Sequence, residues 1–150
     1  MKIFAENKKA YFNYEILEKL EAGIALIGQE VKSIKNGRIN LAGSYVVLRN
    51  NEAFLVGSKI PPYQPKNAPA DYNSERPRKL LLKKSEIKYL IGKTKQKGLT
   101  LAPLKVYTKD GKIKLEFGIA KGKKKFDKRE LIKKRETERE IRRTLKQNIT

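Results

Sequence analysis

The sequence predicts a mostly β fold in which short antiparallel strands close into a small barrel with helices. Two observations predict it: apolar residues alternate with polar ones in several short segments, and turn-forming residues separate those segments at hairpin spacing. A third observation is that only two interior segments have helical character within 150 residues. Six strands with two to three helices in a chain of this size favour an OB-like six-stranded antiparallel barrel.

The first β region lies near the N-terminus. Residues 14–20 and 24–27 are rich in β-branched and aliphatic side chains, and Ala22-Gly23 separates them. Glycine tolerates the backbone angles of a bend or bulge, so we expect the strand to bend there.

Two further pairs of strands are each separated by a turn rich in Asn, Asp or Gly. They are 44–49 and 53–60 around 50–52, and 101–108 and 112–120 around 109–111. In the last strand Ile113, Leu115 and Phe117 alternate with Lys114 and Glu116. The apolar three are therefore predicted to face the core and the charged two to face outward.

Two helices are expected between these strands. The first covers residues 29–35 and ends at Asn36-Gly37, a pair typical of helix C-termini. The second covers residues 85–98, with Ser85 as N-cap and Glu86 in its first turn. Its predicted inner stripe consists of Ile87, Leu90, Ile91 and Thr94.

Charge is the extreme feature of the composition. The chain carries 36 Lys and Arg against 16 Asp and Glu, a net charge of +20 and a pI near 10.1. Such a field favours polyanions, of which nucleic acid is the commonest for a small protein. Residues 121–150 alone hold 13 cations and 5 acids but only five aliphatic side chains. We therefore expect two units: a barrel over 1–120, and a basic tail over 121–150 that is disordered alone and helical on a polyanionic surface.

Several classes of function are disfavoured. The chain has no Cys and no His, which removes disulfides, thiolate and imidazole metal sites and the usual neutral-pH proton shuttle. It has no 18-residue apolar run and no apolar segment of a signal peptide at its start. We expect a cytoplasmic monomer with no membrane partner, no cofactor, no metal and no enzymatic activity.

Two carboxylates leave one enzymatic alternative open. Glu21 and Glu30 are close in sequence, and a Mg²⁺-dependent nuclease uses such pairs, although no third acidic residue accompanies them. In the favoured interpretation Glu30 opens the first helix, where its charge suits the positive end of the helix dipole. Glu21 then orients neighbouring cations or accepts hydrogen bonds from base edges and ribose hydroxyls.

Three basic segments are candidate RNA contacts. Arg78 and Lys79 follow the proline-rich loop 61–77 and are predicted to contact phosphates. Asn7, Lys8 and Lys9 form a second candidate patch.

The third segment joins barrel and tail. Gly122 is expected to act as a hinge and Phe126 as a ring that stacks on a base. The cations around them, with Asp127 as a helix N-cap, are predicted to clamp phosphates: Lys121, Lys123, Lys124, Lys125, Lys128 and Arg129.

Several blocks of sequence together resemble a bacterial family, small protein B or SsrA-binding protein. The resemblance runs from Asn7 to Lys146 in collinear order. Its blocks are Asn7-Lys8-Lys9-Ala10, Glu21-Ala22-Gly23-Ile24, Gly28 with Glu30-Val31-Lys32-Ser33, Arg78 to Leu82, Gly98 to Leu104, and Gly122-Lys123-Lys124 with Asp127-Lys128-Arg129.

The resemblance implies an OB-like barrel that binds the tRNA-like domain of transfer-messenger RNA (tmRNA, SsrA). With elongation factor Tu, reached indirectly through alanyl-tmRNA, the complex enters stalled ribosomes for trans-translation. The tail then occupies the vacant decoding site of the small subunit and the mRNA channel, and no bond chemistry is performed. A constitutive ribosomal RNA-binding protein remains the alternative function.

The resemblance also implies roles for individual residues. Glu21, Leu81 and Lys114 are similar to positions that bind RNA in the family, and the flanking residues are Asn7, Lys8, Lys9, Glu30, Lys32, Arg78 and Lys79. The tail set includes Lys123, Lys124, Asp127, Lys128 and Arg129. Phe126 stands where the family often has His or Tyr, which keeps the stacking ring and removes its polar edge.

Overall fold

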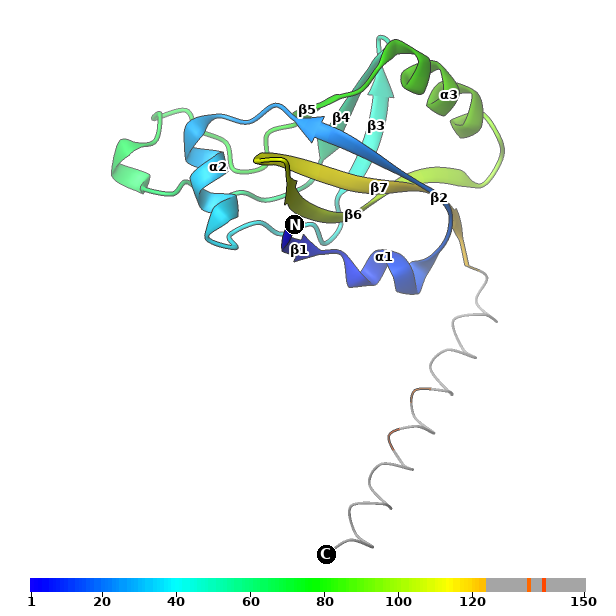
Figure 1. Cartoon of the computed structure of the whole chain (residues 1–150), viewed down its shortest axis with the longest axis horizontal. Helices are drawn as coiled ribbons and strands as arrows, with labels where there is room; N and C mark the ends of the chain where they lie inside the picture. Colours follow the sequence, from blue (N-terminus) through cyan, green and yellow to red (C-terminus); the bar gives the residue numbers. More distant parts are fainter. Residues whose placement is uncertain (124–134, 136–138, 140–150) are drawn as a thin grey trace, which may run out of the picture.

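The computed structural model describes residues 1–123, 135 and 139 of the chain (Figure 1). In this part, seven strands form one antiparallel sheet, accompanied by three α-helices and one 3-10 turn. In chain order the elements are β1 (Lys2–Glu6), α1 (Lys8–Asn13), β2 (Tyr14–Ile24), α2 (Gly28–Lys35), β3 (Tyr45–Arg49), β4 (Glu52–Val56), η1 (Pro65–Asn67), β5 (Arg78–Leu81), α3 (Lys84–Thr94), β6 (Leu99–Lys109) and β7 (Lys112–Gly122).

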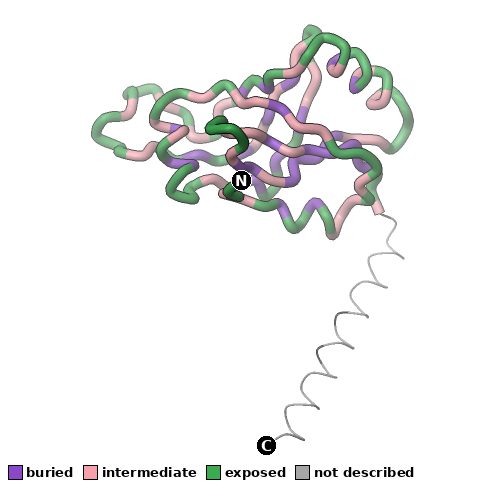
Figure 2. The backbone as a smooth tube through the Cα atoms, viewed as in Figure 1, coloured by how far each residue is buried: buried purple, intermediate pink, exposed green. Residues whose placement is uncertain are grey.

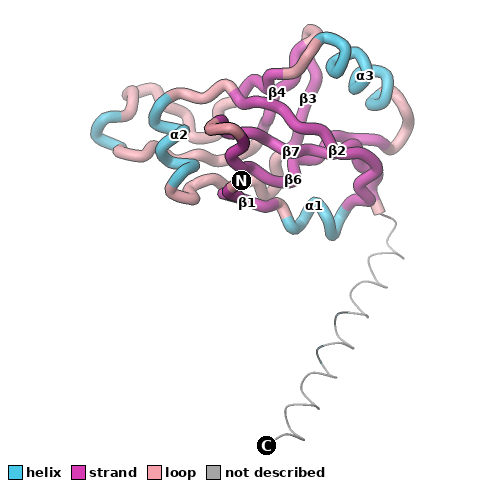
Figure 3. Tube along the Cα trace, in the orientation of Figure 1, coloured by secondary structure: helices cyan, strands magenta, loops and turns pink. Residues whose placement is uncertain are grey.

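The strands are ordered β1-β6-β7-β2-β5-β4-β3, and neighbouring strands are antiparallel. Figure 3 shows the strands gathered in the centre, with the helices α1, α2 and α3 at the periphery. The sheet curls so that β3, at one edge, returns to lie against β6. The prediction of a mostly β fold with antiparallel strands and two to three helices is confirmed. The strand number is seven rather than six. The predicted segments 14–20 and 24–27 correspond to the single strand β2, and the structure adds two strands that were not predicted, β1 and β5.

Both predicted hairpins form, and their turns have the chemistry that the sequence indicated. Asn50 and Asn51 have φ of 52° and 61°, and Asp110 and Gly111 have φ of 53° and 74°. Two successive residues with positive φ make the turn type whose twist matches that of paired strands. Asn, Asp and Gly tolerate this conformation best, so these turns fix the register of β3–β4 and β6–β7.

The core fills the inside of the curled sheet, and Figure 2 shows buried positions running along its strands. Leu115 and Phe117 are fully buried as predicted, whereas Ile113 near the β6–β7 turn is only partly covered. The principal cluster comprises Ala22, Ile34, Leu41, Val46, Ala53, Leu55, Ile60, Leu80, Leu90, Leu101, Val106, Leu115, Phe117 and Ile119. At about 25 cal/mol per Å² of apolar area, this burial is the main stabilising term of the fold.

The two predicted helices are present with altered ends. α2 begins one residue before the predicted start, and the Ile27 amide donates to Oε1 of Glu30 at 3.0 Å. α3 ends at Thr94 rather than at 98, and its N-cap is Lys83, whose amide donates to Glu86, so Ser85 is not the cap. Among the described residues, no helix combines the length and the apolar content needed to cross a lipid bilayer.

The short helix α1 was not predicted from the sequence. The residue before it, Asn7, donates its backbone amide to the Leu104 carbonyl at 2.7 Å and its Nδ2 to the Pro103 carbonyl at 3.0 Å. Ala10 packs with Ala102 and Leu104 in a second, smaller apolar cluster. Six residues are too few for a stable isolated helix, so these contacts with β6 hold it in place.

Strand β2 is continuous from Tyr14 to Ile24, so the bend predicted at Ala22-Gly23 is wrong. Its irregularity instead lies between Ile16 and Glu18, opposite β7. β7 continues to Gly122, two residues beyond the predicted end of the barrel at 120, because Lys121 and Gly122 pair with β2.

Gly118 accommodates this irregularity, which leads to a stability prediction. A Cβ at Gly118 would lie 2.8 Å from Cγ2 of Ile16 and 2.9 Å from the Glu18 carbonyl oxygen, closer than atoms tolerate. Gly118→Ala is therefore expected to reduce the free energy of unfolding by about 1–3 kcal/mol, measured by urea denaturation. Gly92→Ala on exposed α3 is the control: no atom lies within 4 Å of its Cβ, and a gain of about 0.5–1 kcal/mol is expected. Equal responses of the two variants would contradict this account of Gly118.

Candidate nucleic-acid interface

The outer face of the sheet brings together four of the residues predicted to bind RNA. Gly23 on β2 is paired with Leu81 on β5 and with Lys114 on β7, so these positions share one face. The opposite face carries the core residues. A cavity of about 590 Å³ opens on the outer face and is lined by Glu21, Gly23, Asn51, Glu52, Lys79, Leu80, Leu81, Leu82, Lys83, Glu86, Ile87 and Lys114.

Leu81 is an exposed apolar side chain in the middle of this charged face. It is 56% exposed and lies over Gly23, where a Cβ would be 3.3 Å from Cδ1 of Leu81. Because Gly23 has no side chain, Leu81 has room to lie over it. An apolar group beside Lys79 and Lys114 offers a contact surface for a base or ribose flanked by sites for phosphate.

Glu21 is held in a fixed position on the same face. The hydroxyl of Tyr107 donates to Oε2 of Glu21, and Nζ of Lys109 lies 3.7 Å from the same oxygen. Burial of the phenol and the neighbouring Glu21 carboxylate raise the pKa of Tyr107 far above its ordinary value. Tyr107 therefore remains a hydrogen-bond donor at physiological pH, and Glu21 remains an oriented acceptor.

A second carboxylate, Glu116, lies opposite Glu21 across the β2–β7 pairing. Nζ of Lys19 is 3.7 Å from one of its oxygens and Nζ of Lys105 is 3.8 Å from the other. These distances are too long for hydrogen bonds, so neither lysine donates to Glu116. Lys79, on the same face, does donate to Oε1 of Glu52 at 3.4 Å.

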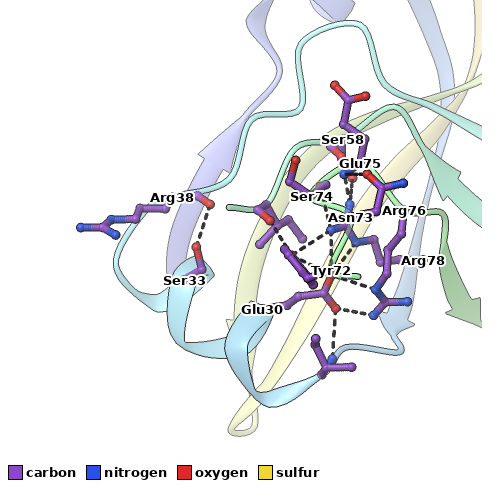
Figure 4. A network of polar contacts seen from close by, with 12 residues as sticks. Glu30, Ser33, Arg38, Ser58, Tyr72, Asn73, Ser74, Glu75, Arg76 and Arg78 are labelled. Atoms are coloured by element: carbon purple, nitrogen blue, oxygen red, sulfur yellow. Dashed lines mark hydrogen bonds and ion pairs between the residues drawn. The ribbon is translucent and has the colours of Figure 1, made fainter. Parts of the chain in front are cut away.

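Arg78 and Glu30 are buried in the interior. The guanidinium of Arg78 is therefore not presented for the predicted phosphate contact, and Glu30 lies in the first turn of α2, as the sequence predicted. Each side chain is 0% exposed. Nε and Nη2 of Arg78 donate to Oε2 of Glu30 at 2.9 and 2.7 Å, and Nη1 donates to the Ser58 carbonyl at 2.9 Å (Figure 4). Arg76 also donates to both oxygens of Glu30. The two arginines therefore hold α2, β5 and the end of the proline-rich loop together.

This network has a consequence for acid stability. Burial alone would raise the pKa of Glu30, but hydrogen bonds from Arg76, the Ile27 amide and Arg78 outweigh it and lower that pKa below its ordinary 4.5. Because Glu30 then binds a proton more tightly in the unfolded state, its ionised form stabilises the fold above pH 4.5. This stabilisation is lost as the pH falls through the lower pKa that Glu30 has in the folded state. The difference in Tm between wild type and Glu30→Gln is expected to shrink between about pH 7 and about pH 3. A constant difference would contradict this, and Glu52→Gln, a half-exposed carboxylate on β4, is the control.

The remaining predicted residues of the barrel lie elsewhere. Asn7 is buried beneath α1 and bonded to Pro103, so a direct RNA contact by its side chain is also contradicted. Lys8 and Lys9 are exposed on α1, and Lys9 lines a separate cavity of about 420 Å³ between α1 and the start of β3. Lys32 is exposed on α2, with its Nζ 5.9 Å from the centre of the Tyr63 ring. These three lysines do not line the cavity around Leu81.

The predicted tail set is described only at its start. Lys121 is exposed at the end of β7, and Lys123 donates its amide to the Asn13 carbonyl and its Nζ to the Tyr11 carbonyl, both at 3.0 Å. The start of the tail is therefore tied to α1. Lys124, Lys125, Phe126, Asp127, Lys128 and Arg129 lie outside the described residues.

The nuclease alternative required Glu21 and Glu30 to share a metal ion. Glu21 lies on the outer face, whereas both oxygens of Glu30 accept hydrogen bonds from guanidinium groups in the interior. Across residues 1–123, 135 and 139, no three His, Cys, Asp or Glu side chains are grouped to hold a metal. The pair is therefore not arranged for two-carboxylate metal chemistry.

Sequence reasoning missed Tyr107, Lys105 and Lys83, which belong to the outer face or line its cavity. A signal was available for two of them. Lys105 and Tyr107 alternate with the core residues Leu104 and Val106 in a predicted strand, so the two-residue period places both on the opposite face, where Tyr107 is covered and only 3% exposed. Lys83 carried no such signal, because it lies in the link between β5 and α3.

Fold and surface together define a small, strongly basic β-sheet protein with the kind of face that binds nucleic acid. The SmpB protein family matches residues 4–147 of the chain. The SsrA-binding protein of Enterococcus faecalis is 52% identical over 147 residues, covering 98% of this chain and 95% of that protein. The SsrA-binding protein of Carboxydothermus hydrogenoformans is 54% identical over 145 residues, covering 97% of each.

A solved structure described as "tmRNA-SmpB: a journey to the center of the bacterial ribosome" is also similar. It shares 47% sequence identity and superposes with a TM-score of 0.66, covering 81% of this chain and 85% of that one. The chain belongs to the SmpB protein family. The resemblance drawn from the sequence motifs is confirmed.

Proposed function

We propose that this protein is an RNA-binding adaptor that delivers tmRNA to stalled ribosomes for trans-translation. Its relatives are SsrA-binding proteins, and a similar solved structure is of tmRNA and SmpB on the bacterial ribosome. The barrel binds the tRNA-like domain of tmRNA, and residues 121–150 occupy the vacant decoding site and the mRNA channel. Elongation factor Tu is reached only through alanyl-tmRNA, and the protein acts in the cytoplasm without bond chemistry.

The observation that carries this proposal is the grouping of Glu21, Lys79, Leu81 and Lys114 around one cavity on the outer face. The two lysines supply charge for phosphates, and Leu81 supplies an apolar surface for a base or ribose. Glu21, oriented by Tyr107, accepts from a ribose 2′-hydroxyl or a base amino group. The cations of this face bind any polyanion, so a carboxylate that accepts a hydrogen bond from a base or ribose adds selectivity.

Lys114 provides the sharpest test of this face. It stands on β7 opposite Gly23 and Tyr107, and its side chain is not part of the core cluster. Lys114→Glu is expected to weaken tmRNA binding at least about tenfold and to reduce the salt slope of binding by about one or more. Thermal stability should change little, by about 0.5 kcal/mol or less, as for other surface substitutions. Electrophoretic mobility shifts at several salt concentrations and thermal melts measure these effects.

Lys66→Glu is the matched control for Lys114→Glu, because it makes the same charge change on exposed η1, away from the outer face. Equal losses of affinity in the two variants would show that only net charge matters and would refute a localised site. An unfolded Lys114→Glu protein would assign Lys114 a structural role instead.

The alternative, a constitutive ribosomal protein, predicts different behaviour during purification. A permanent subunit remains at one copy per ribosome through a high-salt wash, whereas an adaptor recruited with tmRNA does not. Quantitative immunoblotting of washed ribosomes from unstressed cells distinguishes the two functions.

A further inference from the structure

The C-terminal half of α1 is contacted by two residues of the tail. Lys123 donates its amide to the Asn13 carbonyl and its Nζ to the Tyr11 carbonyl, both at 3.0 Å. Further along the chain, the guanidinium carbon of Arg135 lies 5.0 Å from the centre of the Phe12 ring. Three consecutive residues of α1 therefore contact the tail, and we call Tyr11, Phe12 and Asn13 the α1 docking site.

The α1 docking site is held in place by the barrel. The amide of Asn7, which precedes α1, donates to the Leu104 carbonyl, and Ala10 packs with Leu104 in the smaller apolar cluster. Tyr14, which follows α1 directly, pairs with Gly122 on β7. Because α1 is attached to the sheet at both ends, it offers the tail a fixed surface.

Each contact is one that a helix end or an aromatic ring forms with a cation. The last carbonyls of a helix lack donors within the helix, and the amide and ammonium groups of Lys123 supply them. Phe12 is only partly buried, and the face of an aromatic ring attracts a guanidinium. α1 contains no acidic residue, so on this helix Arg135 is held by a ring and not by a carboxylate.

The contact between Arg135 and Phe12 is weaker than the contact that a phosphate makes with a guanidinium. A cation over a partly exposed ring gains little free energy in water, whereas a phosphate accepts two charge-assisted hydrogen bonds from one guanidinium. RNA that approaches the tail therefore competes with Phe12 for Arg135.

We propose that the α1 docking site holds the protein's own tail on the barrel through Arg135, and that RNA phosphates displace it. The inference deepens the proposed function and rests on it for the identity of the polyanion. A ligand binds more weakly when part of the protein population must first break an internal contact. The α1 docking site therefore lowers the affinity of the tail for stray RNA, and none of its three residues lines the cavity around Leu81.

Paramagnetic relaxation in the full-length protein tests the docking. The chain has no Cys, so Arg139→Cys provides a single site for a nitroxide label, one helical turn after Arg135. At low salt the label is expected to broaden the amide NMR signals of the α1 docking site. Phe12→Leu, which keeps an apolar side chain without an aromatic ring, should lower the ratio of docked to undocked molecules about two- to fivefold. Absence of broadening in the labelled parent, or equal broadening in Phe12→Leu, would overturn the docking.

Two further variants separate this contact from a general effect on the barrel. Arg135→Gln removes the cation from the tail, outside the barrel, and should reduce the broadening as Phe12→Leu does. Tyr11→Leu removes an exposed ring of the same helix that lies 5.7 Å from Nζ of Lys19, and it should leave the broadening unchanged. Loss of the broadening in Tyr11→Leu, or its persistence in Arg135→Gln, would overturn the pairing of Arg135 with Phe12.

Displacement is tested by adding a single-stranded oligouridine RNA to the same labelled protein. The broadening should disappear at saturating RNA. Phe12→Leu should bind this RNA about twofold more tightly than wild type, because fewer molecules have a docked contact to break. Broadening that persists at saturation, or weaker binding by Phe12→Leu, would overturn the displacement. Failure of the proposed function would appear instead as absence of any tmRNA binding that Lys114→Glu weakens, and it would leave the broadening by the label unchanged.

Discussion

Arg78→Ala is expected to lower the free energy of unfolding by about 3–5 kcal/mol. The substitution leaves Oε2 of Glu30 without its two donors from Arg78 in an interior site that is 0% exposed. It also leaves the Ser58 and Ser74 carbonyls without the guanidinium that donates to them. Urea denaturation followed by circular dichroism measures the loss, which is a large part of the stability of an ordinary domain.

Two comparisons isolate the cause of that loss. Lys79→Ala, at the exposed neighbouring position on β5, should change stability by about 0.5 kcal/mol or less. The double variant Glu30→Leu with Arg78→Met removes both members of the ion pair. Its loss in free energy of unfolding should be smaller than the sum of the losses of the two single variants. A loss below about 1 kcal/mol in Arg78→Ala would mean that the ion pair contributes little.

Truncation after Lys123 should abolish tagging of stalled nascent chains while leaving tmRNA affinity within about twofold of wild type. The described residues that line the cavity around Leu81, to which we assign the RNA contact, all precede the cut. The removed residues 124–150 hold much of the positive charge to which we assign the ribosomal contact. Filter binding to tmRNA and a reconstituted tagging reaction measure the two effects separately.

The cut is placed after Lys123 for a structural reason. Lys121 and Gly122 still pair with Glu15 and Tyr14, and Lys123 bonds to the Tyr11 and Asn13 carbonyls. A cut after Ala120 would remove these contacts and is expected to lower the Tm as well. If truncation after Lys123 reduced tmRNA affinity as strongly as it reduced tagging, the assignment of separate roles to barrel and tail would fail.

The turns were predictable from the sequence because their chemistry is local. Asn50-Asn51 and Asp110-Gly111 favour positive φ, and that preference acts on the chain before any tertiary contact forms. β1 and α1 were not predictable in the same way. They are short, and they depend on partners about a hundred residues away, such as the Leu104 carbonyl that accepts from Asn7.

The site was predicted in part, and one error is instructive. Glu21, Lys79, Leu81 and Lys114 were all identified and all line the cavity. Arg78 was grouped with Lys79 because both are cations, although adjacent residues of a strand face opposite sides. Arg78 and Leu80 are two positions apart on β5, so the two-residue period places both inside and Lys79 outside.

Strand β7 carries Lys114 near one end and leads into the tail at the other, without interruption between Lys112 and Gly122. At about 3.3 Å per residue, the eight steps from Lys114 to Gly122 span roughly 26 Å. One continuous strand thus sets the distance between Lys114, to which we assign an RNA contact, and Gly122, where the strand ends and the tail follows. Inserting two residues into β7 would therefore misplace the tail relative to the RNA-binding face, even with every contacting side chain intact.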